Sequence, residues 1–291
     1  MTSDFRFNHN AVPFHGFCCY RFETLGSTQD LLKEWVSQGL AKPGTVVLAE
    51  GQTSGRGRPG HIWESLQGKG LWMSVYFQPC IPAEWAFGWN MRLALAVCKV
   101  LDALVPSVPW QIKWPNDWVT YQGRKVGGML VENQLKGSCI TDSLVGIGIN
   151  VDEDAVNSSL PYATSLRGEW KRSTLAEQES NDFRKEGLLQ ALLAEFEFMM
   201  NPGGDSSKGF NFAVNNPITG GWNVEKIIGD VESRLYGLGQ RLPFQCGDRT
   251  EYWITLGLDQ GGGLRVRSES GELQQTLIHP HYRLAYTLNL S

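Results

Sequence analysis

Two arginines stand among glycines in one short segment of the chain. Residues 51–63 read GQTSGRGRPGHIW, which places Arg56 and Arg58 in a stretch that contains four glycines. Glycine lets the main chain approach a ligand closely, and a guanidinium group can hold phosphate or carboxylate through paired hydrogen bonds. The segment therefore predicts a loop that wraps a small anionic ligand.

A second cluster of polar residues follows further along the chain. The sequence KWPND at residues 113–117 precedes KVGGMLVE at residues 125–132. Two arginines with one or both of Lys113 and Lys125 could neutralise a carboxylate that is brought against an α-phosphate. Asp117 could hold Mg²⁺ on the pyrophosphate that leaves. Together the two segments match what adenylation of a carboxylic acid requires.

Each of these segments also has other interpretations. Residues 55–60 formally match GxGxxG, but a dinucleotide-binding loop opens directly into a helix, and residues 59–62 do not start one. Taken alone, the first segment could be a solvated connector or a tract that binds RNA loosely. The second could consist of hairpin ends joined by salt bridges, since Asn-Asp is a common turn pair.

Two further features have both a functional and a packing interpretation. Trp63 offers a flat face for an adenine ring, although a tryptophan beside a strand is often part of the core. The sequence GIGIN at residues 146–150 puts small residues where a backbone could approach a ligand, or where strands pack tightly. The sequence leaves these alternatives open.

Hydrophobic periodicity predicts the elements that position these residues. A first strand is expected at residues 17–22, and STQD at residues 27–30 resembles a capping box that starts a helix ending before Gly39. An apolar strand at residues 45–50 delivers the glycine and arginine segment at its end.

The rest of the chain predicts a mixed or antiparallel α+β sheet followed by a small barrel. Strands are expected at residues 71–77, 111–114, 117–121, 125–132 and 139–150, and helices at residues 87–105 and 188–200. Four strands in succession disfavour a doubly wound parallel fold. Short strands at residues 241–246, 251–258, 263–269, 273–278 and 282–288 suggest a small C-terminal β-barrel.

Composition narrows the class of protein. Of the 291 residues, 42% are hydrophobic, which supports a packed globular core, and the formal net charge of −4 gives no field that could hold DNA. The six cysteines form no CxxC pair, and no apolar run is long enough for a membrane helix. We therefore expect a reduced, cytoplasmic protein without a membrane or DNA partner.

The ordered motifs resemble those of the biotin protein ligases, also called biotin–[acetyl-CoA-carboxylase] ligases. Residues 27–30 resemble the Ser-Thr-Asn motif of that family, residues 55–63 its GRGRxGRxW, and residues 113–117 its KWPND. Residues 125–132 are similar to KLGGILVE, and residues 146–151 to GIGINV. The resemblance covers residues 17–200 strongly and the C-terminal strands more loosely.

The resemblance implies a reaction in two steps. Biotin and ATP, with Mg²⁺, would give biotinyl-5′-AMP and pyrophosphate, and a lysine of a biotin carboxyl carrier protein of acetyl-CoA carboxylase would then take the biotinyl group. It also implies a catalytic domain of the biotin/lipoate ligase type at residues 1–238 and an SH3-like domain at residues 239–291. A monomer and a side-by-side homodimer are both known in the family.

The resemblance also assigns roles to individual residues. Biotin would be bound by Ser27, Thr28, Gln29, Gln52, Arg56, Gly57, Arg58 and Lys125. The adenylate and ATP would be bound by Arg56, Arg58, Trp63, Asn116 and Asn150. Lys125 and Arg58 would be catalytic, with Lys125 bridging the biotin carboxylate and the α-phosphate, and Asp117 would be a ligand of Mg²⁺.

The sequence departs from the family pattern at two motifs. Gln29 replaces the usual Asn and adds a methylene group, and residues 59–61 carry His61 where the pattern commonly has Arg. His61 would make retention of the adenylate sensitive to pH, because histidine ordinarily titrates near pH 6.5. Only sixteen residues precede the first expected strand, so we expect no N-terminal winged helix and no role in gene regulation.

Two rival functions are also compatible with parts of the sequence. A lipoate or octanoate ligase would use the same catalytic fold, but the Arg-Arg and Ser-Gly-Gly-Gly pattern of that family is not found. A non-catalytic module that binds nucleotides or nucleic acid would show salt-sensitive binding without nucleotide turnover.

Overall fold

A computed structural model describes residues 12–14, 16–57, 62–152, 160–173, 184–200, 223–278 and 281–285. The large sheet contains β1 (Val12–Phe14), β2 (Phe17–Leu25), β3 (Thr45–Gln52), β4 (Gly70–Phe77), β5 (Ile81–Pro82), β6 (Gln111–Lys113), β7 (Asp117–Val119), β8 (Lys125–Lys136) and β9 (Cys139–Asn150). Its order is β1-β2-β3-β4-β9-β8-β7-β6, and β5 pairs with β9. The helices are α1 (Thr28–Ser37), α2 (Ala86–Leu104), α3 (Leu166–Arg172), α4 (Lys185–Met200) and α5 (Val224–Glu232).

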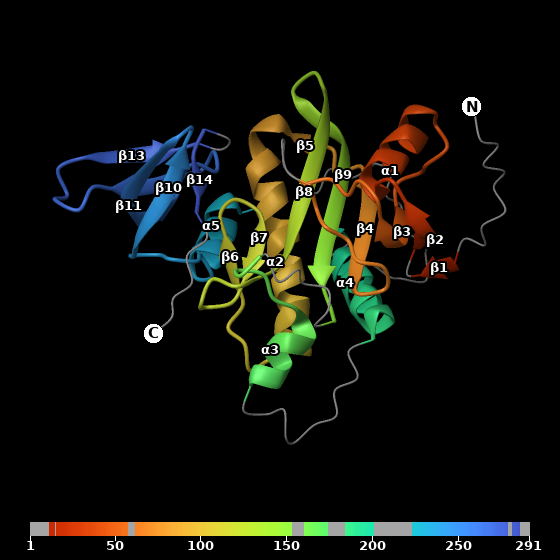
Figure 1. The fold of residues 1–291 in the computed structure, drawn as a ribbon. Helices are drawn as coiled ribbons and strands as arrows, with labels where there is room; N and C mark the ends of the chain where they lie inside the picture. Colours follow the sequence, from red (N-terminus) through yellow and green to blue (C-terminus); the bar gives the residue numbers. More distant parts are fainter. Residues whose placement is uncertain are drawn as a thin grey trace.

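A second sheet follows in the sequence. Its strands are β10 (Arg241–Cys246), β11 (Arg249–Leu258), β12 (Leu264–Arg267), β13 (Gln274–Leu277) and β14 (Arg283–Leu284), in the antiparallel order β13-β12-β11-β10-β14. It lies beside the β6 and β7 end of the large sheet, away from β1 (Figure 1). Among the described residues these strands form one antiparallel sheet, as the strand pattern predicted, and no pairing that would close it between β13 and β14 is seen there.

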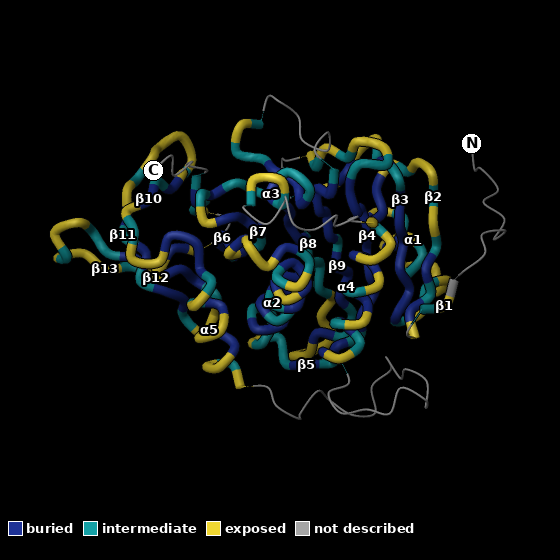
Figure 2. The backbone as a smooth tube through the Cα atoms, turned by 90° about the horizontal axis from the view of Figure 1, so that it is seen from below, coloured by how far each residue is buried: buried dark blue, intermediate teal, exposed yellow. Residues whose placement is uncertain are grey.

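Helices cover the two faces of the large sheet. Because side chains alternate along a strand, neighbouring residues of β3 enter different clusters. Val46 packs in the larger core with α2 and α4, whereas Val47 packs with Leu32 of α1. In Figure 2 the central strands are mostly buried, and exposed residues lie at the outer end of the C-terminal sheet. α1 therefore lies on one face, with α2 and α4 on the other.

Helix α1 serves as the crossover between two parallel strands. β2 and β3 pair in parallel, so the connection between them must return the chain to the end of the sheet at which β2 began. Ser27 caps the helix by accepting a hydrogen bond from the backbone N–H of Asp30 at 3.3 Å. The predicted capping box is thus confirmed at its N-cap, and it fixes Thr28 and Gln29 in the first turn.

Small residues leave part of the α1 face of the sheet open. Gly128 pairs with Gly148, and Leu130 pairs with Gly146, so these four positions point to the same side. Leu144, two residues from Gly146 on β9, packs against α1 on that side. The glycines therefore lie where the sheet continues beyond the helix, and they leave space for a cavity.

The mixed α+β fold expected from the sequence is confirmed, with two helices that the periodicity did not predict, α3 and α5. All six cysteines are free thiols. Among the residues that the structure describes, no helix combines the length and the apolar character needed to cross a membrane.

Candidate active site

A cavity of about 560 Å³ opens on the α1 face of the large sheet. Its walls are formed by the start of α1, by residues after β3, by the glycine positions of β8 and β9, and by an edge of the C-terminal sheet. The predicted biotin residues that line it are Ser27, Thr28, Gln29, Gln52, Arg56, Gly57 and Lys125. The other predicted residues that line it are Trp63, Asn116, Asp117 and Asn150. Arg58 and His61 lie outside the described residues.

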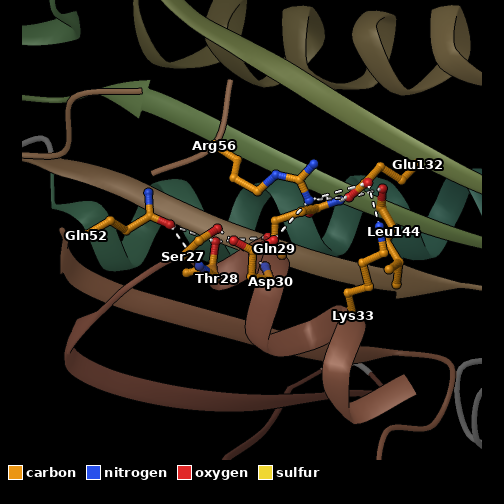
Figure 3. Close-up of polar contacts among 10 residues, drawn as sticks. Ser27, Thr28, Gln29, Asp30, Lys33, Gln52, Arg56, Glu132 and Leu144 are labelled. Carbon is orange, nitrogen blue, oxygen red and sulfur yellow. Dashed lines mark hydrogen bonds and ion pairs between the residues drawn. The ribbon is translucent and has the colours of Figure 1, made fainter. Parts of the chain in front are cut away.

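Polar groups at the start of α1 are paired with one another (Figure 3). The backbone N–H of Thr28 donates to Gln52 Oε1 at 2.8 Å, and the Thr28 hydroxyl lies 2.9 Å from the Ser74 hydroxyl. Gln52 Nε2 in turn donates to the Ser65 hydroxyl at 2.8 Å. These bonds join α1, β3 and β4, and they fix the orientation of the Gln52 amide toward the cavity wall.

Arg56 is held at the rim by two carboxylates (Figure 3). Its Nη1 lies 2.9 Å from Asp30 Oδ1 and 3.2 Å from Glu132 Oε2. The Arg56 side chain is 36% exposed, and ion pairs at that exposure contribute about 0–1 kcal/mol. An incoming phosphate group could therefore replace these partners at little cost.

Lys125 and Asp117 form an ion pair inside the cavity. Lys125 Nζ lies 2.8 Å from Asp117 Oδ1, and the Asp117 side chain is only 4% exposed. The same ammonium lies 4.9 Å from the centre of the Trp63 ring. A buried carboxylate and an aromatic face thus position this cation in the cavity wall.

The Trp63 indole fits between glycines of the sheet. A Cβ on Gly148 would lie 2.5 Å from the indole, and one on Gly128 would lie 3.3 Å from it. The ring meets Trp72 edge to face at 6.2 Å between centroids. The indole Nε1 is buried without a hydrogen-bond partner in the described part of the chain. The glycines on this face therefore make room for the Trp63 side chain. The sequence had suggested only the approach of a ligand or the tight packing of strands at GIGIN.

Two asparagines predicted to bind the nucleotide are held by backbone carbonyl groups. Asn116 Nδ2 donates to the Met129 carbonyl, and Asn150 Nδ2 donates to the Thr164 carbonyl at 2.9 Å. The Asn116 Oδ1 atom is buried without a partner among the described residues. Each amide is thus fixed by its nitrogen, which leaves its oxygen as the acceptor.

Lys113 is not among the residues that line the cavity. Its side chain is 1% exposed, and its Nζ donates to the backbone carbonyl of Leu284 at 2.5 Å. Trp114 Nε1 donates to the Gly262 carbonyl at 2.9 Å. Residues at the start of KWPND thus fasten the C-terminal sheet beside the site, and Lys125 is the lysine of the two that lines the cavity.

Sequence reasoning missed several residues of the site. Ser74, Gln245 and Arg283 line the cavity, and Glu132 binds residues at its rim. Glu132 had a signal in the sequence, since alternation along β8 puts it on the same face as Gly128. The C-terminal residues had none, because their position depends on how the two sheets pack.

Comparison with known proteins supports a relationship over most of the chain. The sequence profile described as "Biotin/lipoate A/B protein ligase family" matches residues 22–150. The bifunctional ligase/repressor BirA of Escherichia coli is 30% identical over 242 residues, which cover 79% of this chain and 68% of that protein. A biotin–[acetyl-CoA-carboxylase] ligase of Paracoccus denitrificans is 29% identical over 230 residues, which cover 77% of this chain and 85% of that protein.

A solved structure shows the same architecture. The biotin protein ligase of Aquifex aeolicus in complex with biotin and ATP has a TM-score of 0.65 and 26% identity, and the match covers 92% of this chain and 99% of that one. The fold is thus the catalytic fold of a biotin ligase, with a C-terminal antiparallel sheet of the SH3-like type. The chain belongs to the biotin/lipoate A/B protein ligase family.

Proposed function

We propose that this protein is an ATP-dependent ligase that activates biotin as biotinyl-5′-AMP and transfers the biotinyl group to a lysine of a biotin carboxyl carrier protein. Relatives named as biotin ligases and a similar structure that contains biotin and ATP support this proposal. The observation that carries it is the Lys125 ammonium, which Asp117 holds at 2.8 Å in the same cavity as the paired polar groups of α1.

The first step joins two anions. A carboxylate oxygen of biotin attacks the α-phosphorus of ATP, the bond from that phosphorus to the bridging oxygen of the β-phosphate breaks, and pyrophosphate leaves. Cations that are fixed before the reaction lower the cost of bringing the two anions together and stabilise the charge that develops. In this proposal Lys125 bridges the carboxylate and the α-phosphate, and Arg56 and Arg58 enclose the adenylate.

The second step moves the acyl group to the carrier. The neutral amine of the carrier lysine attacks the acyl carbon of the mixed anhydride, the bond to the phosphate oxygen breaks, and AMP leaves as the amine loses a proton. The acid would be bound at the α1 end by Ser27, Thr28, Gln29 and Gln52 with Gly57. The nucleotide would contact Trp63, Asn116 and Asn150.

Mg²⁺ would enter with ATP. The described residues contain no group of three or more His, Cys, Asp or Glu side chains that could hold a metal ion, and the Asp117 carboxylate contacts Lys125. The residues therefore do not form a metal site of their own, whereas Mg²⁺ is commonly held by phosphate oxygens with one or two carboxylates. Asp117 as that carboxylate stays a prediction.

The transfer reaction tests the proposal. Purified protein is incubated with ATP, Mg²⁺, biotin and a biotin carboxyl carrier domain, and the carrier is analysed by mass spectrometry. We expect the addition of one biotinyl group to a single lysine, and no addition to a carrier in which that lysine is replaced by arginine. An unmodified carrier, or modification only when lipoate or octanoate replaces biotin, would contradict the proposal.

A further inference from the structure

Glu132 holds the amide of Gln29 in one orientation. We propose that Glu132 is a positioning residue that makes Gln29 present its amide oxygen to the acid, so that the site selects acids whose ring carries an N–H donor. The cyclic urea of biotin has such donors, whereas lipoate and octanoate have none. The inference rests on the proposed function and adds a determinant of its choice of acid.

The hydrogen bonds of Gln29 fix which atom faces which group. Gln29 is 3% exposed, and its Nε2 donates to Glu132 Oε2 at 2.9 Å and to the Leu144 carbonyl at 3.3 Å (Figure 3). An amide nitrogen carries two donors, and both are used here. The reversed amide would place its oxygen against two acceptors, which repel it. The oxygen is therefore the atom left to face elsewhere.

The free acceptor belongs to the cavity. Gln29 Oε1 is buried and has no hydrogen-bond partner among the residues that the structure describes. Gln29 and Gly146 both line the cavity, and a Cβ on Gly146 would lie 2.9 Å from this oxygen. Glycine at position 146 thus leaves room around the oxygen. A buried acceptor without a partner costs free energy, which an N–H of the ligand would recover.

Glu132 is held in the form that accepts hydrogen bonds. Burial raises the pKa of its carboxyl group, but hydrogen bonds from Gln29 and Lys33 and the charge of Arg56 outweigh that effect, so its pKa lies below the ordinary value. Lys33 Nζ lies 2.9 Å from Glu132 Oε1. The ionised carboxylate can only accept, so it pairs with the nitrogen of the Gln29 amide and not with the oxygen.

Selectivity follows from the unpaired oxygen. A site built to hydrogen-bond a substrate N–H rejects an analogue that lacks it far more strongly than an apolar pocket rejects a changed methylene group. An alkyl chain or a dithiolane ring in this site would leave Gln29 Oε1 without a partner. The added methylene of Gln29, relative to the Asn of the family pattern, brings the amide within reach of Glu132 on β8.

The test compares acids in pyrophosphate release without carrier. For Glu132→Met we expect KM for biotin to rise about tenfold or more, the scale of one lost hydrogen bond, with little change in KM for ATP. The preference for biotin over octanoate should fall in parallel. Glu132→Gln keeps an acceptor oxygen and should recover most of the preference, which a merely structural role of the carboxylate would not predict.

Two further variants isolate the contact with Gln29. Lys33→Met removes another partner of Glu132 and should leave KM for biotin unchanged. Gln29→Met removes the amide, and adding Glu132→Met to it should cause no further rise in KM for biotin. A full additional rise would show that Glu132 acts through another residue, such as Arg56, and would overturn the inference.

The outcomes separate the inference from the proposed function. If the wild-type protein releases no pyrophosphate with biotin, the proposed function fails. If it does, and Glu132→Met keeps the wild-type KM for biotin and the wild-type preference, the inference alone fails. Should Glu132→Met not fold, as judged by its melting curve, Gln29→Met carries the test, and a wild-type preference for biotin in that variant would overturn the inference.

Discussion

At the α1 end of the cavity, hydrogen bonds of Thr28, Gln29 and Gln52 join four strands and a helix, whereas at the β7 and β8 end the ion pair of Lys125 and Asp117 dominates. The first end presents oriented dipoles, and the second presents a fixed charge. Oriented dipoles discriminate between ligands of similar size, and a fixed cation stabilises charge that appears during a reaction. Changes at the two ends should therefore affect different kinetic constants.

The largest expected effect is at the charged end. Lys125→Met removes the ammonium, and pyrophosphate release with biotin should fall by at least ~10²-fold, the scale seen when one transition-state donor is lost. Lys99→Met is the matched control, since Lys99 is exposed and pairs with Glu195 on the far helices. Release kinetics and a melting curve are measured together.

The buried carboxylate left behind complicates that variant. If Lys125→Met melts early because Asp117 has lost its ion pair, Lys125→Met with Asp117→Asn removes both charges and should restore the fold without restoring activity. Pyrophosphate release at the wild-type rate in a folded variant would remove Lys125 from the mechanism.

A pair of glycine substitutions separates the two ends next. A Cβ on Gly148 meets the Trp63 indole at 2.5 Å, and one on Gly146 meets Gln29 Oε1 at 2.9 Å. Gly148→Ala should raise KM for ATP and Gly146→Ala should raise KM for biotin, each roughly tenfold, because each displaces a side chain that the proposed function places against one substrate. Steady-state kinetics with each substrate varied give both constants.

Gly187 of α4 supplies the control for this pair, since a Cβ there would meet no atom within 4 Å. Gly187→Ala should leave both constants unchanged. Equal effects of Gly146→Ala and Gly148→Ala on the two constants would contradict the division of the cavity into two ends.

Acid should weaken the contacts of Glu169 on α3 with Arg124, the residue before Lys125. Glu169 is 3% exposed, and although burial raises its pKa, hydrogen bonds from Arg124 and Thr164 and the charges of Arg124 and Arg172 lower it below the ordinary value. A lowered pKa in the folded state gives stability that is present above the ordinary pKa and is lost as pH falls through the folded-state pKa. Glu169→Gln should therefore lose about 2 kcal/mol at pH 7.

Melting curves of wild type and Glu169→Gln at several pH values check the direction of this pH dependence. The stability lost in Glu169→Gln relative to wild type should be largest at pH 7, and it should become smaller once the pH falls below the ordinary carboxyl pKa of 4.5. A difference that widens on acidification would contradict the assignment.

The smallest expected effect concerns the carboxylates that hold Arg56 at the rim of the cavity. Asp30→Asn removes one of the two carboxylates that hold Arg56, and exposed pairs of this kind contribute about 0–1 kcal/mol. We expect nearly unchanged stability and a modest change in KM for ATP, measured at low and high salt. A loss as large as that of Lys125→Met would mean that Arg56 must be oriented before the ligand binds.

Much of the fold was predictable because its signals are local. The Ser27 cap, the alternation in β3 and the apolar spacing of α2 each identify an element from neighbouring residues. The short α3 was not predictable in this way, since seven residues have little helical preference of their own and tertiary packing decides. The strand order of the C-terminal sheet depends on which strands pair, which the strand spacing does not determine.

The site was predictable where motifs name its residues, and not where distant segments meet. Lys125 and Thr28 were expected in one site, and both line the cavity. The burial of Lys113 against Leu284 depends on the packing of the two sheets, and no local pattern reports it. The contact of Glu132 with Gln29 likewise requires the register of β8 beside β9 and the position of α1.

The most direct test of the account is pyrophosphate release by the purified protein with ATP, Mg²⁺ and either biotin, lipoate or octanoate, in the absence of carrier. The account predicts release with biotin, and little or none with the two acids that lack a ring N–H. Release with lipoate or octanoate at the rate seen with biotin would contradict the selectivity assigned to the α1 end, and no release with any acid would contradict the proposed ligase reaction.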